Sequence, residues 1–220
     1  MIVGEFVAAA VVGYLLGAIP FALIVSRRMA GIDISEYGSG NIGGTNVLGT
    51  VGKKAGAIVI VLDLGKAVAA VMLAKIIIGD SVLLVAGFPL HWQVGQVLAA
   101  LMAMVGHNWS VYVKFRGGKG VAVYYGSWFA MYPAAALFGG VIIILTCIRS
   151  RYMSLGSMAG ALGILCLMIV LTVAYEFPLV YAVYSLVAAC LIVYQHRDNI
   201  SRLLSGTELR FGERRQKLNL

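Results

Sequence analysis

The sequence predicts an all-α integral membrane protein with about seven transmembrane helices, its amino terminus outside the cell and its carboxyl terminus in the cytoplasm. Of the 220 residues, 61% are hydrophobic and only 12% are charged, whereas soluble domains carry about 25% charged residues. The charged residues are also gathered in short connections between long apolar segments. Both observations indicate a chain whose helices are surrounded by lipid.

Seven apolar segments are predicted to be helices, because backbone groups in lipid must be paired within the segment. Val94–Val105 and Val121–Met131 are shorter than the roughly 20 residues of a full span, so we expect them to be extended by neighbouring residues or tilted and partly covered by protein. The first segment lacks a charged leader and a cleavage signature and is predicted to be retained. The segments are Ile2–Val25, Ala55–Ile78, Val94–Val105, Val121–Met131, Pro133–Cys147, Leu155–Ala174 and Pro178–Tyr194.

Among the connections between these segments, only alternate ones contain basic residues, and Lys and Arg accumulate in cytoplasmic loops. The connections at residues 79–93, 132–133 and 175–176 contain no Lys or Arg. An odd number of helices with the amino terminus outside satisfies both sets of connections. It leaves residues 195–220 as a basic, amphipathic cytoplasmic tail of one domain spanning residues 1–220. The predicted inside cations are Arg27, Arg28, Lys53, Lys54, Lys114, Arg116, Lys119, Arg149, Arg151, Arg197, Arg202, Arg210, Arg214, Arg215 and Lys217.

The composition also argues against several classes of ligand. The formal net charge is +8, but the basic residues form no continuous patch with interleaved aromatic residues, so nucleic acid is not a predicted partner. Cys147, Cys166 and Cys190 lie singly in apolar segments, which indicates small residues surrounded by lipid or protein rather than a disulfide or metal site. The sequence has no H-E-x-x-H and no carboxylate cluster, so neither a metal nor another cofactor is predicted.

Two of the charged residues inside the second apolar segment are close enough in sequence to pair. Asp63 and Lys66 are three residues apart, a spacing that puts them on one helical face, where they can neutralise each other. We favour a structural ion pair. The alternative is that Lys66 reaches an anionic ligand, since charges within a membrane usually have a function.

The first inside connection is rich in glycine. Gly38, Gly40 and Gly43 spell G-x-G-x-x-G, but the flanks are membrane helices instead of a βαβ unit, and Gly44 stands where a P-loop needs Lys. Closely spaced glycines still let backbone N–H groups converge on an anion. We therefore predict an oxyanion cradle, with a flexible turn as the alternative. Its side-chain hydrogen-bonding groups belong to Ser39, Asn41, Thr45 and Asn46.

The second inside connection adds cations to the same pattern. Lys119 is flanked by glycines, and the helix that follows points its positive end at the same place, so phosphate is the predicted ligand. Alternatively, Lys114 and Arg116 anchor the chain in lipid head groups, and His107 caps the last carbonyls of its helix. The other candidate binding residues here are Asn108, Gly117, Gly118 and Gly120.

The remaining candidates come from the third connection and the tail. Ser154 and Ser157 are three residues apart at the predicted start of a helix, and the alternative is that one of them is only an N-cap. In the tail, His196, Asn199 and Arg202 share one helical face. A plain amphipathic surface helix is the alternative interpretation of this stretch.

Taken together, these blocks resemble a known family. They are Gly38–Asn46, Lys114–Ala122, Arg151–Ser157 and His196–Glu208. In this order they are similar to the acyl-phosphate-dependent glycerol-3-phosphate acyltransferases of bacterial membranes, the PlsY family, whose seven-helix arrangement agrees with the count above. The resemblance covers nearly the whole chain.

The resemblance implies transfer of a fatty acyl group from acyl phosphate to the 1-hydroxyl of glycerol 3-phosphate at the cytoplasmic face of the bacterial membrane. The products are lysophosphatidic acid and phosphate, and no cofactor is needed. By position, Ser39, Asn41 and Lys119 would hold phosphate together with the loop at residues 117–120. Acyl phosphate is already reactive, so positioning could supply most of the acceleration. The residues that would orient glycerol 3-phosphate are Ser154, His196 and Asn199, with His196 the best candidate for a general base.

One residue departs from the family pattern. Gly49 stands where the family has Arg, which removes a guanidinium suited to bidentate phosphate binding. We expect Lys53 or Lys54 to replace part of that charge. The alternative functions are a diverged member with another phosphorylated acceptor or no activity, and an anion transporter, whose sites usually lie at mid-membrane.

Overall fold

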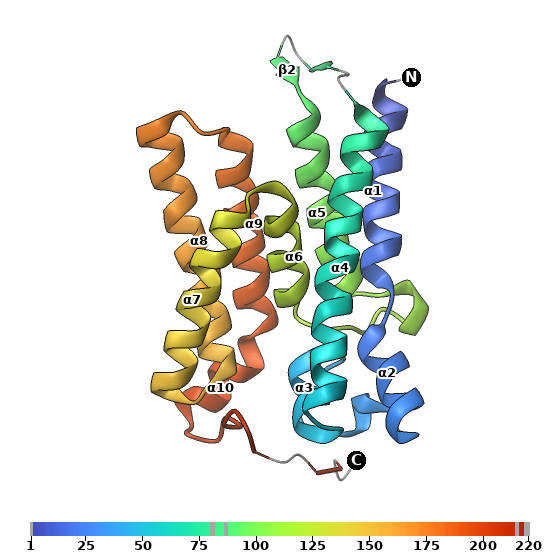
Figure 1. The fold of residues 1–220 in the computed structure, drawn as a ribbon, viewed down its shortest axis with the longest axis vertical. Helices are drawn as coiled ribbons and strands as arrows, with labels where there is room; N and C mark the ends of the chain where they lie inside the picture. Colours follow the sequence, from blue (N-terminus) through green and yellow to red (C-terminus); the bar gives the residue numbers. More distant parts are fainter. Residues whose placement is uncertain (1, 80–81, 86–87, 214–215, 218–220) are drawn as a thin grey trace.

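The computed structural model describes residues 2–79, 82–85, 88–213 and 216–217, which fold into a bundle of helices (Figure 1). A short antiparallel hairpin, with Leu83 opposite Leu90, lies at one end of the bundle. Two 3-10 turns, η1 and η2, lie in the connections. The elements are α1 (Ile2–Ala18), α2 (Phe21–Ala30), η1 (Ile34–Glu36), α3 (Gly44–Thr50), α4 (Lys53–Ile78), β1 (Leu83–Val85), β2 (Phe88–Leu90), α5 (Trp92–Asn108), η2 (Val111–Val113), α6 (Val121–Met131), α7 (Pro133–Ser150), α8 (Met153–Tyr175), α9 (Leu179–Gln195) and α10 (Arg197–Leu204).

The helices form two groups with α6 between them. α1, α4 and α5 pack on one another, and α8 packs on both α7 and α9. The short helix α6 contacts both α4 and α7, and its aromatic side chains fill the centre of the larger core. Trp128 and Tyr184 are fully buried there, with ring centroids 5.3 Å apart. The core therefore ties α6 to α9 and fixes the loop that precedes α6.

All seven predicted segments contain helix, but the number that cross the membrane is a separate question. Within the described residues, Ile2–Ala30, Lys53–Ile78, Pro133–Ser150 and Met153–Tyr175 are long and apolar enough to span a bilayer. A fifth span results if α9 and α10, which are bent by 56°, count as one. α5 and α6 have 17 and 11 residues, so the expected total of seven spans remains a prediction.

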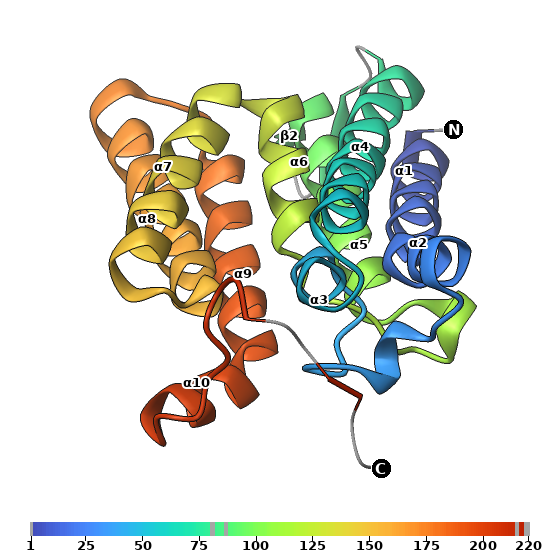
Figure 2. The same ribbon diagram turned by 60° about the horizontal axis from the view of Figure 1, so that its bottom comes forward.

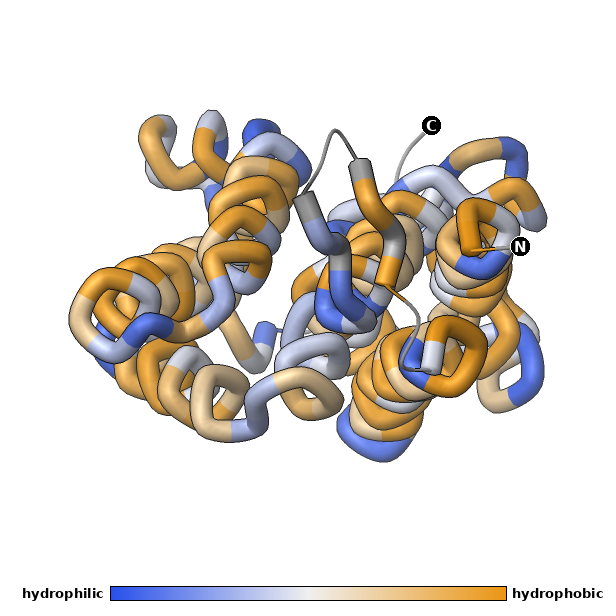
Figure 3. Tube along the Cα trace, turned by 90° about the horizontal axis from the view of Figure 1, so that it is seen from above, coloured by the Kyte–Doolittle hydropathy of each residue, from blue (hydrophilic) through white to orange (hydrophobic). Residues whose placement is uncertain are grey.

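Large hydrophobic side chains are exposed on the outer faces of the bundle, as expected for helices in contact with lipid. Val61, Ile76, Ile148 and Val173 are all exposed. Figure 3, which looks along the bundle from the hairpin end, shows hydrophobic residues along the helices of both groups. The chain is therefore an integral membrane protein.

The first predicted helix is interrupted, which corrects the expectation of one helix over Ile2–Val25. α1 ends at Ala18 and α2 begins at Phe21, with Pro20 between them. Proline has no N–H to donate and its ring blocks the preceding turn, so a helix rarely continues through it. The break exposes the carbonyl of Ile19 to a side chain from α4.

Small residues let α1 and α5 approach each other closely. A β-carbon on Gly17 would lie 2.1 Å from the carbonyl oxygen of Ala103, and one on Gly106 would lie 2.2 Å from that of Tyr14. Any larger side chain at either glycine would push the helices apart. This contact fixes the end of α5, where His107 and Asn108 lie.

Candidate active site

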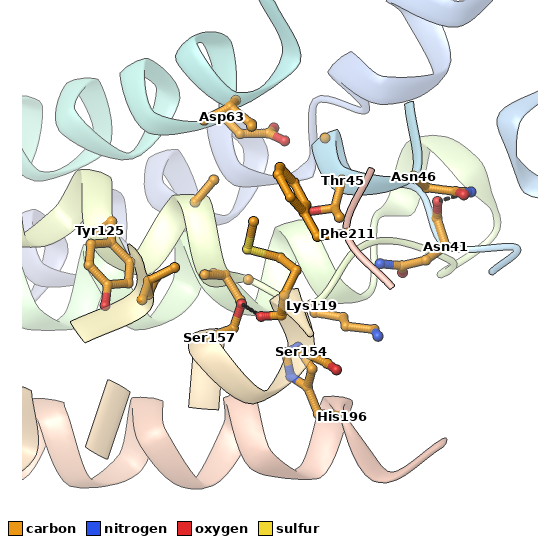
Figure 4. A pocket seen from close by; sticks show the side chains of 18 of the residues that line it. Asn41, Thr45, Asn46, Asp63, Lys119, Tyr125, Ser154, Ser157, His196 and Phe211 are labelled. Atoms are coloured by element: carbon orange, nitrogen blue, oxygen red, sulfur yellow. Dashed lines mark hydrogen bonds between the residues drawn. The ribbon is translucent and has the colours of Figure 1, made fainter. Parts of the chain in front are cut away.

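A cavity of about 610 Å³ opens among the loops at the end of the bundle opposite the hairpin and extends between the two groups of helices. Its loop end is polar and its other end is apolar. Figure 4 shows Lys119, Ser154 and His196 together, with Tyr125 farther along the cavity. The predicted site residues that line it are Ser39, Asn41, Gly43, Asn46, His107, Lys119, Gly120, Ser154, Ser157, His196 and Asn199.

The other predicted residues lie just outside this lining. Gly38 and Gly40 have φ of 59° and 69° and shape the first loop, a backbone conformation that glycine adopts without strain. Gly117 and Gly118 support the second loop. Asn108 is buried behind Gly120, where a β-carbon would lie 3.0 Å from its Oδ1.

Asn46 organises the first loop, a role that the sequence did not reveal. Its side-chain amide donates to the carbonyls of Ile34, Tyr37 and Asn41 at 3.2, 2.9 and 3.0 Å. Its Oδ1 accepts a hydrogen bond from the backbone N–H of Ser39 at 3.3 Å. One buried side chain thus holds the backbone that carries Ser39 and Asn41 to the cavity.

The second loop is packed against the end of α5. The N–H of Gly118 donates to the carbonyl of His107 at 3.0 Å, and a β-carbon on Gly117 would lie only 2.0 Å from that same oxygen. Ile42 donates to the carbonyl of Gly117 at 3.4 Å and so links the first loop to the second. The loop then leads through Lys119 into the amino-terminal end of α6.

Lys119 belongs to a network that includes the tail. Its ammonium donates to Oδ1 of Asn199. The carboxylate of Glu208 accepts hydrogen bonds from Asn199 at 2.5 Å, Ser154 at 2.6 Å and Arg202 at 2.8 Å. Burial alone would raise the pKa of Glu208, but these hydrogen bonds and the charge of Arg202 outweigh it and lower the pKa below its usual value.

His196 is held in one tautomer by its backbone. Its Nδ1 lies 2.7 Å from the carbonyl oxygen of Ile192, which can only accept a hydrogen bond. Nδ1 therefore carries the proton, and a neutral ring has a lone pair on Nε2. A histidine in this state can accept a proton from a bound hydroxyl group.

The residues after α10 return across the mouth of the cavity. The N–H of Phe211 donates to the carbonyl of Arg151 at 2.7 Å, and the N–H of Gly38 donates to the backbone carbonyl of Gln216 at 2.9 Å. Leu209 and Phe211 line the cavity, and Figure 2 shows this part of the chain beside α10. The tail is therefore part of the site's wall.

Several alternatives from the sequence are corrected. Tyr152 occupies the N-cap position of α8, so neither serine is the cap: Ser154 donates to Glu208, and Ser157 donates to the carbonyl of Met153. The ring of His107 contacts Lys66 instead of capping α5.

The predicted replacement of the missing arginine receives no support. Lys53 and Lys54 are exposed at the start of α4, and the described cations that line the cavity are Lys119 and Arg202. The predicted ion pair of Asp63 and Lys66, in contrast, is confirmed with an N–O distance of 2.7 Å.

Sequence reasoning missed two acidic residues that line the cavity, Asp63 and Glu208. The spacing of Asp63 and Lys66 predicts only their pairing and not a place for Asp63 in the cavity wall. The sequence offered two signals for Glu208: it is an acid in a mainly basic tail, and it ends the block His196–Glu208 that carries the family resemblance.

Comparisons with known proteins show the family to which the chain belongs. The sequence profile of the family described as "Glycerol-3-phosphate acyltransferase" matches residues 7–206. Glycerol-3-phosphate acyltransferase 3 of Dehalococcoides mccartyi is 44% identical over 214 residues, covering 97% of this chain and 99% of that protein. Glycerol-3-phosphate acyltransferase 2 of Moorella thermoacetica is 43% identical over 206 residues, covering 94% and 97%.

Solved structures give the same result. The glycerol 3-phosphate form of PlsY, an integral membrane glycerol 3-phosphate acyltransferase, is 33% identical with a TM-score of 0.80, covering 94% of this chain and 96% of that one. Its lysophosphatidic acid form is 33% identical with a TM-score of 0.79, covering 94% and 95%. The chain therefore belongs to the glycerol-3-phosphate acyltransferase family of integral membrane proteins.

Proposed function

We propose that this chain transfers a fatty acyl group from acyl phosphate to the 1-hydroxyl of glycerol 3-phosphate, forming lysophosphatidic acid and inorganic phosphate. The observation that carries the proposal is one continuous cavity with two kinds of lining. Its loop end offers an ammonium, hydroxyls, amides and backbone N–H groups to phosphate. Its other end offers apolar side chains to a fatty chain.

The donor's phosphate fits the end formed by the first two loops. Lys119 supplies a positive charge, and the amino-terminal end of α6 follows immediately, where helix N–H groups and the helix dipole favour an anion. Ser39 and Asn41 line the same end. The acyl chain would then extend along α6 and α7 past Tyr125, Leu137 and other apolar residues of the lining.

The acceptor fits between Lys119 and the third loop. Ser154, Asn199 and His196 line the cavity there, and the lone pair on Nε2 of His196 can accept the proton of the 1-hydroxyl. The hydroxyl oxygen forms a bond to the acyl carbon, the bond from that carbon to the phosphate oxygen breaks, and phosphate leaves with the electron pair. Lys119 is placed to stabilise the negative charge on the departing phosphate.

The experiment uses purified protein supplied with acyl phosphate and glycerol 3-phosphate. We expect lysophosphatidic acid and inorganic phosphate to appear in equal amounts, with no product when acyl-CoA replaces acyl phosphate. The control acceptors are glycerol, which has no phosphate, and phosphorylated alcohols other than glycerol 3-phosphate. They are needed because Gly49 replaces the family's arginine. Monodisperse protein that acylates a different acceptor, or moves phosphate across vesicles without forming the lipid, would overturn the proposal.

We infer that the polar end of the cavity faces the cytoplasm of a bacterial cell. The support is that Lys and Arg are absent from residues 79–93 and abundant in the loops around the cavity. Two positions test the orientation in a cysteine-free background: Leu84→Cys at the hairpin and Ser205→Cys in the tail, both exposed. An impermeant thiol reagent should label the first in intact cells and the second only after permeabilisation, and the reverse pattern would refute the orientation.

A further inference from the structure

Lys66 makes three polar contacts inside the bundle but does not itself line the cavity. Its Nζ lies 2.7 Å from Oδ1 of Asp63, 2.8 Å from the carbonyl oxygen of Ile19 and 3.0 Å from Nδ1 of His107. Its side chain is only 2% exposed. Asp63 and His107 line the cavity, whereas Lys66 lies behind them.

The Lys66 ammonium determines which ring nitrogen of His107 carries the proton. A lysine ammonium has three N–H donors and no acceptor. The carbonyl of Ile19 accepts one of them, the carboxylate of Asp63 is the ion-pair partner of the same ammonium, and Nδ1 of His107 is the third polar contact. Nδ1 must then be an acceptor, so the ring carries its proton on Nε2.

The other edge of the same ring faces the glycine loop. A β-carbon on Gly118 would lie 2.1 Å from Nε2 of His107, so the ring packs directly against a residue without a side chain. The N–H of Gly118 also donates to the carbonyl of His107 at 3.0 Å. Any rotation of the ring would therefore disturb the backbone that leads into Lys119.

We propose that Lys66, paired with Asp63, is a positioning residue that holds His107 as an Nε2–H donor at the phosphate end of the cavity. The identity of the ligand rests on the proposed function, whereas the positioning rests only on the contacts above. The site then has two histidines in opposite states. His107 donates from Nε2, and His196, whose Nδ1–H bonds to a carbonyl, accepts at Nε2.

The break at Pro20 is part of this arrangement. A continuous helix would use the carbonyl of Ile19 for its own ladder, whereas here that carbonyl accepts a hydrogen bond from Lys66. Without it, one ammonium proton would lack a partner in the interior, where unpaired polar groups are costly. The break at Pro20 therefore provides one of the acceptors for the buried lysine.

The first measurement reads the tautomer directly. The chain has three histidines, so ¹⁵N-histidine labelling gives few signals, which His91→Gln and His107→Gln assign. We expect wild-type His107 to be protonated at Nε2 and unprotonated at Nδ1. A signal protonated at Nδ1, or at both nitrogens, would overturn the proposal.

The same spectra test Lys66. In Lys66→Met the His107 signals should become those of exchanging tautomers, whereas Lys75→Met, an exposed change in the same helix, should leave them unchanged. If Lys66→Met fails to fold because Asp63 is left unpaired, Asp63→Asn with Lys66→Met removes both charges and provides the same readout. An unchanged His107 tautomer in either folded variant would refute the role of Lys66.

A titration with inorganic phosphate tests the donor. Phosphate should shift Nε2 of His107 in the wild-type protein, and that shift should be lost in Lys66→Met. A response at the amide of Gly118 without one at Nε2 of His107 would show that the ring does not face the ligand, against the proposal.

Kinetics separate positioning from a purely structural role. Lys66→Met should lower kcat/KM by about 10²-fold, the scale expected when a reacting group is misplaced, and Lys75→Met should have little effect. His107→Gln, whose amide nitrogen reaches toward the position of Nε2, should retain about tenfold more activity than His107→Asn, whose oxygen only takes the place of Nδ1. Equal activity of these two folded variants would contradict the donor role.

The two proposals fail in different ways. If the wild-type protein makes no lysophosphatidic acid but the His107 tautomer still depends on Lys66, the proposed function is wrong and the positioning stands. If the wild-type protein is active and the His107 tautomer is the same in folded Lys66 variants, only the proposal that Lys66 positions His107 is wrong.

Discussion

Replacing Glu208 by Gln removes the charge at the centre of the network that joins the tail to the cavity. The Glu208 side chain is 5% exposed and accepts hydrogen bonds from Ser154, Asn199 and Arg202. Glutamine has nearly the same shape, but one of its two terminal atoms is a donor. If the glutamine oxygen accepts the hydrogen bonds of Ser154 and Asn199, the glutamine amide nitrogen faces the N–H of Arg202. Two donors then face each other, and the contact with Arg202 is lost.

The size of the effect follows from these contacts. A hydrogen bond to a charged group contributes about 1.5–3 kcal/mol, so losing the bond to Arg202 costs an amount in that range. The other two hydrogen bonds become neutral, and charge-assisted bonds are roughly twice as strong as neutral ones. Because only part of this loss is felt in the transition state of the reaction, we expect a loss of about 2–3 kcal/mol, or about 30- to 160-fold in kcat/KM.

The assay compares kcat/KM for glycerol 3-phosphate in Glu208→Gln, wild type and Glu213→Gln. Glu213 is an exposed acid in the same tail, so its replacement should have little effect. Both variants must be monodisperse and retain the wild-type helix content. Activity of a folded Glu208→Gln within about twofold of wild type would show that the carboxylate does not position Asn199 and Lys119.

Four further outcomes are expected. Lys119→Ala should lower turnover by at least about 10²-fold through loss of a charge that stabilises the reacting phosphate, and near-normal turnover of stable protein would exclude Lys119 from the site. Gly117→Ala should destabilise the second loop by about 1–3 kcal/mol, because its β-carbon would meet a backbone oxygen at 2.0 Å; Gly65→Ala, with open space around its β-carbon, is the matched control in thermal unfolding. The folded-state pKa of Glu208 is below its ordinary value of 4.5, so its stabilising contribution is present above about pH 4.5 and is lost as pH falls through the lower folded pKa. Thermal unfolding of wild type should show this acid-dependent loss, and a Glu208→Gln curve with the same loss would contradict it. Gly49→Arg should tighten glycerol 3-phosphate binding by about 1.5–3 kcal/mol if the acceptor's phosphate lies near α3, and unchanged affinity in the folded variant would exclude that location.

The helices were predictable because the requirement for paired backbone groups in lipid acts on each segment separately. The residues at which the helices begin and end were less predictable. α4 begins at Lys53 and α7 ends at Ser150, beyond the apolar residues at which the pattern stopped, since a helix continues into polar residues at the membrane surface. At Pro20 the helix is instead shorter than the apolar segment. The apolar residues continue past Pro20, but proline has no N–H to donate and its ring blocks the preceding turn, so the helix ends before it.

The candidate site was predictable as a set of loops but not as a network. Glycines and cations in the first two loops indicate phosphate without knowledge of their partners. The bond between Ser154 and Glu208 joins residues 54 positions apart, and that between Lys119 and Asn199 joins residues 80 apart. No local spacing rule connects such residues, because tertiary packing alone brings them together.

The two-ended cavity has a consequence for how the rate should be expressed. One reactant arrives from water, so its supply is measured per unit volume, whereas a fatty-chain donor that enters the apolar end resides in the bilayer, so its supply is a mole fraction of the surrounding lipid. Adding inert lipid or detergent at a fixed total amount of donor should then slow the reaction by surface dilution, although nothing has changed in bulk concentration. The apparent KM for the donor is accordingly a property of the membrane composition as much as of the protein.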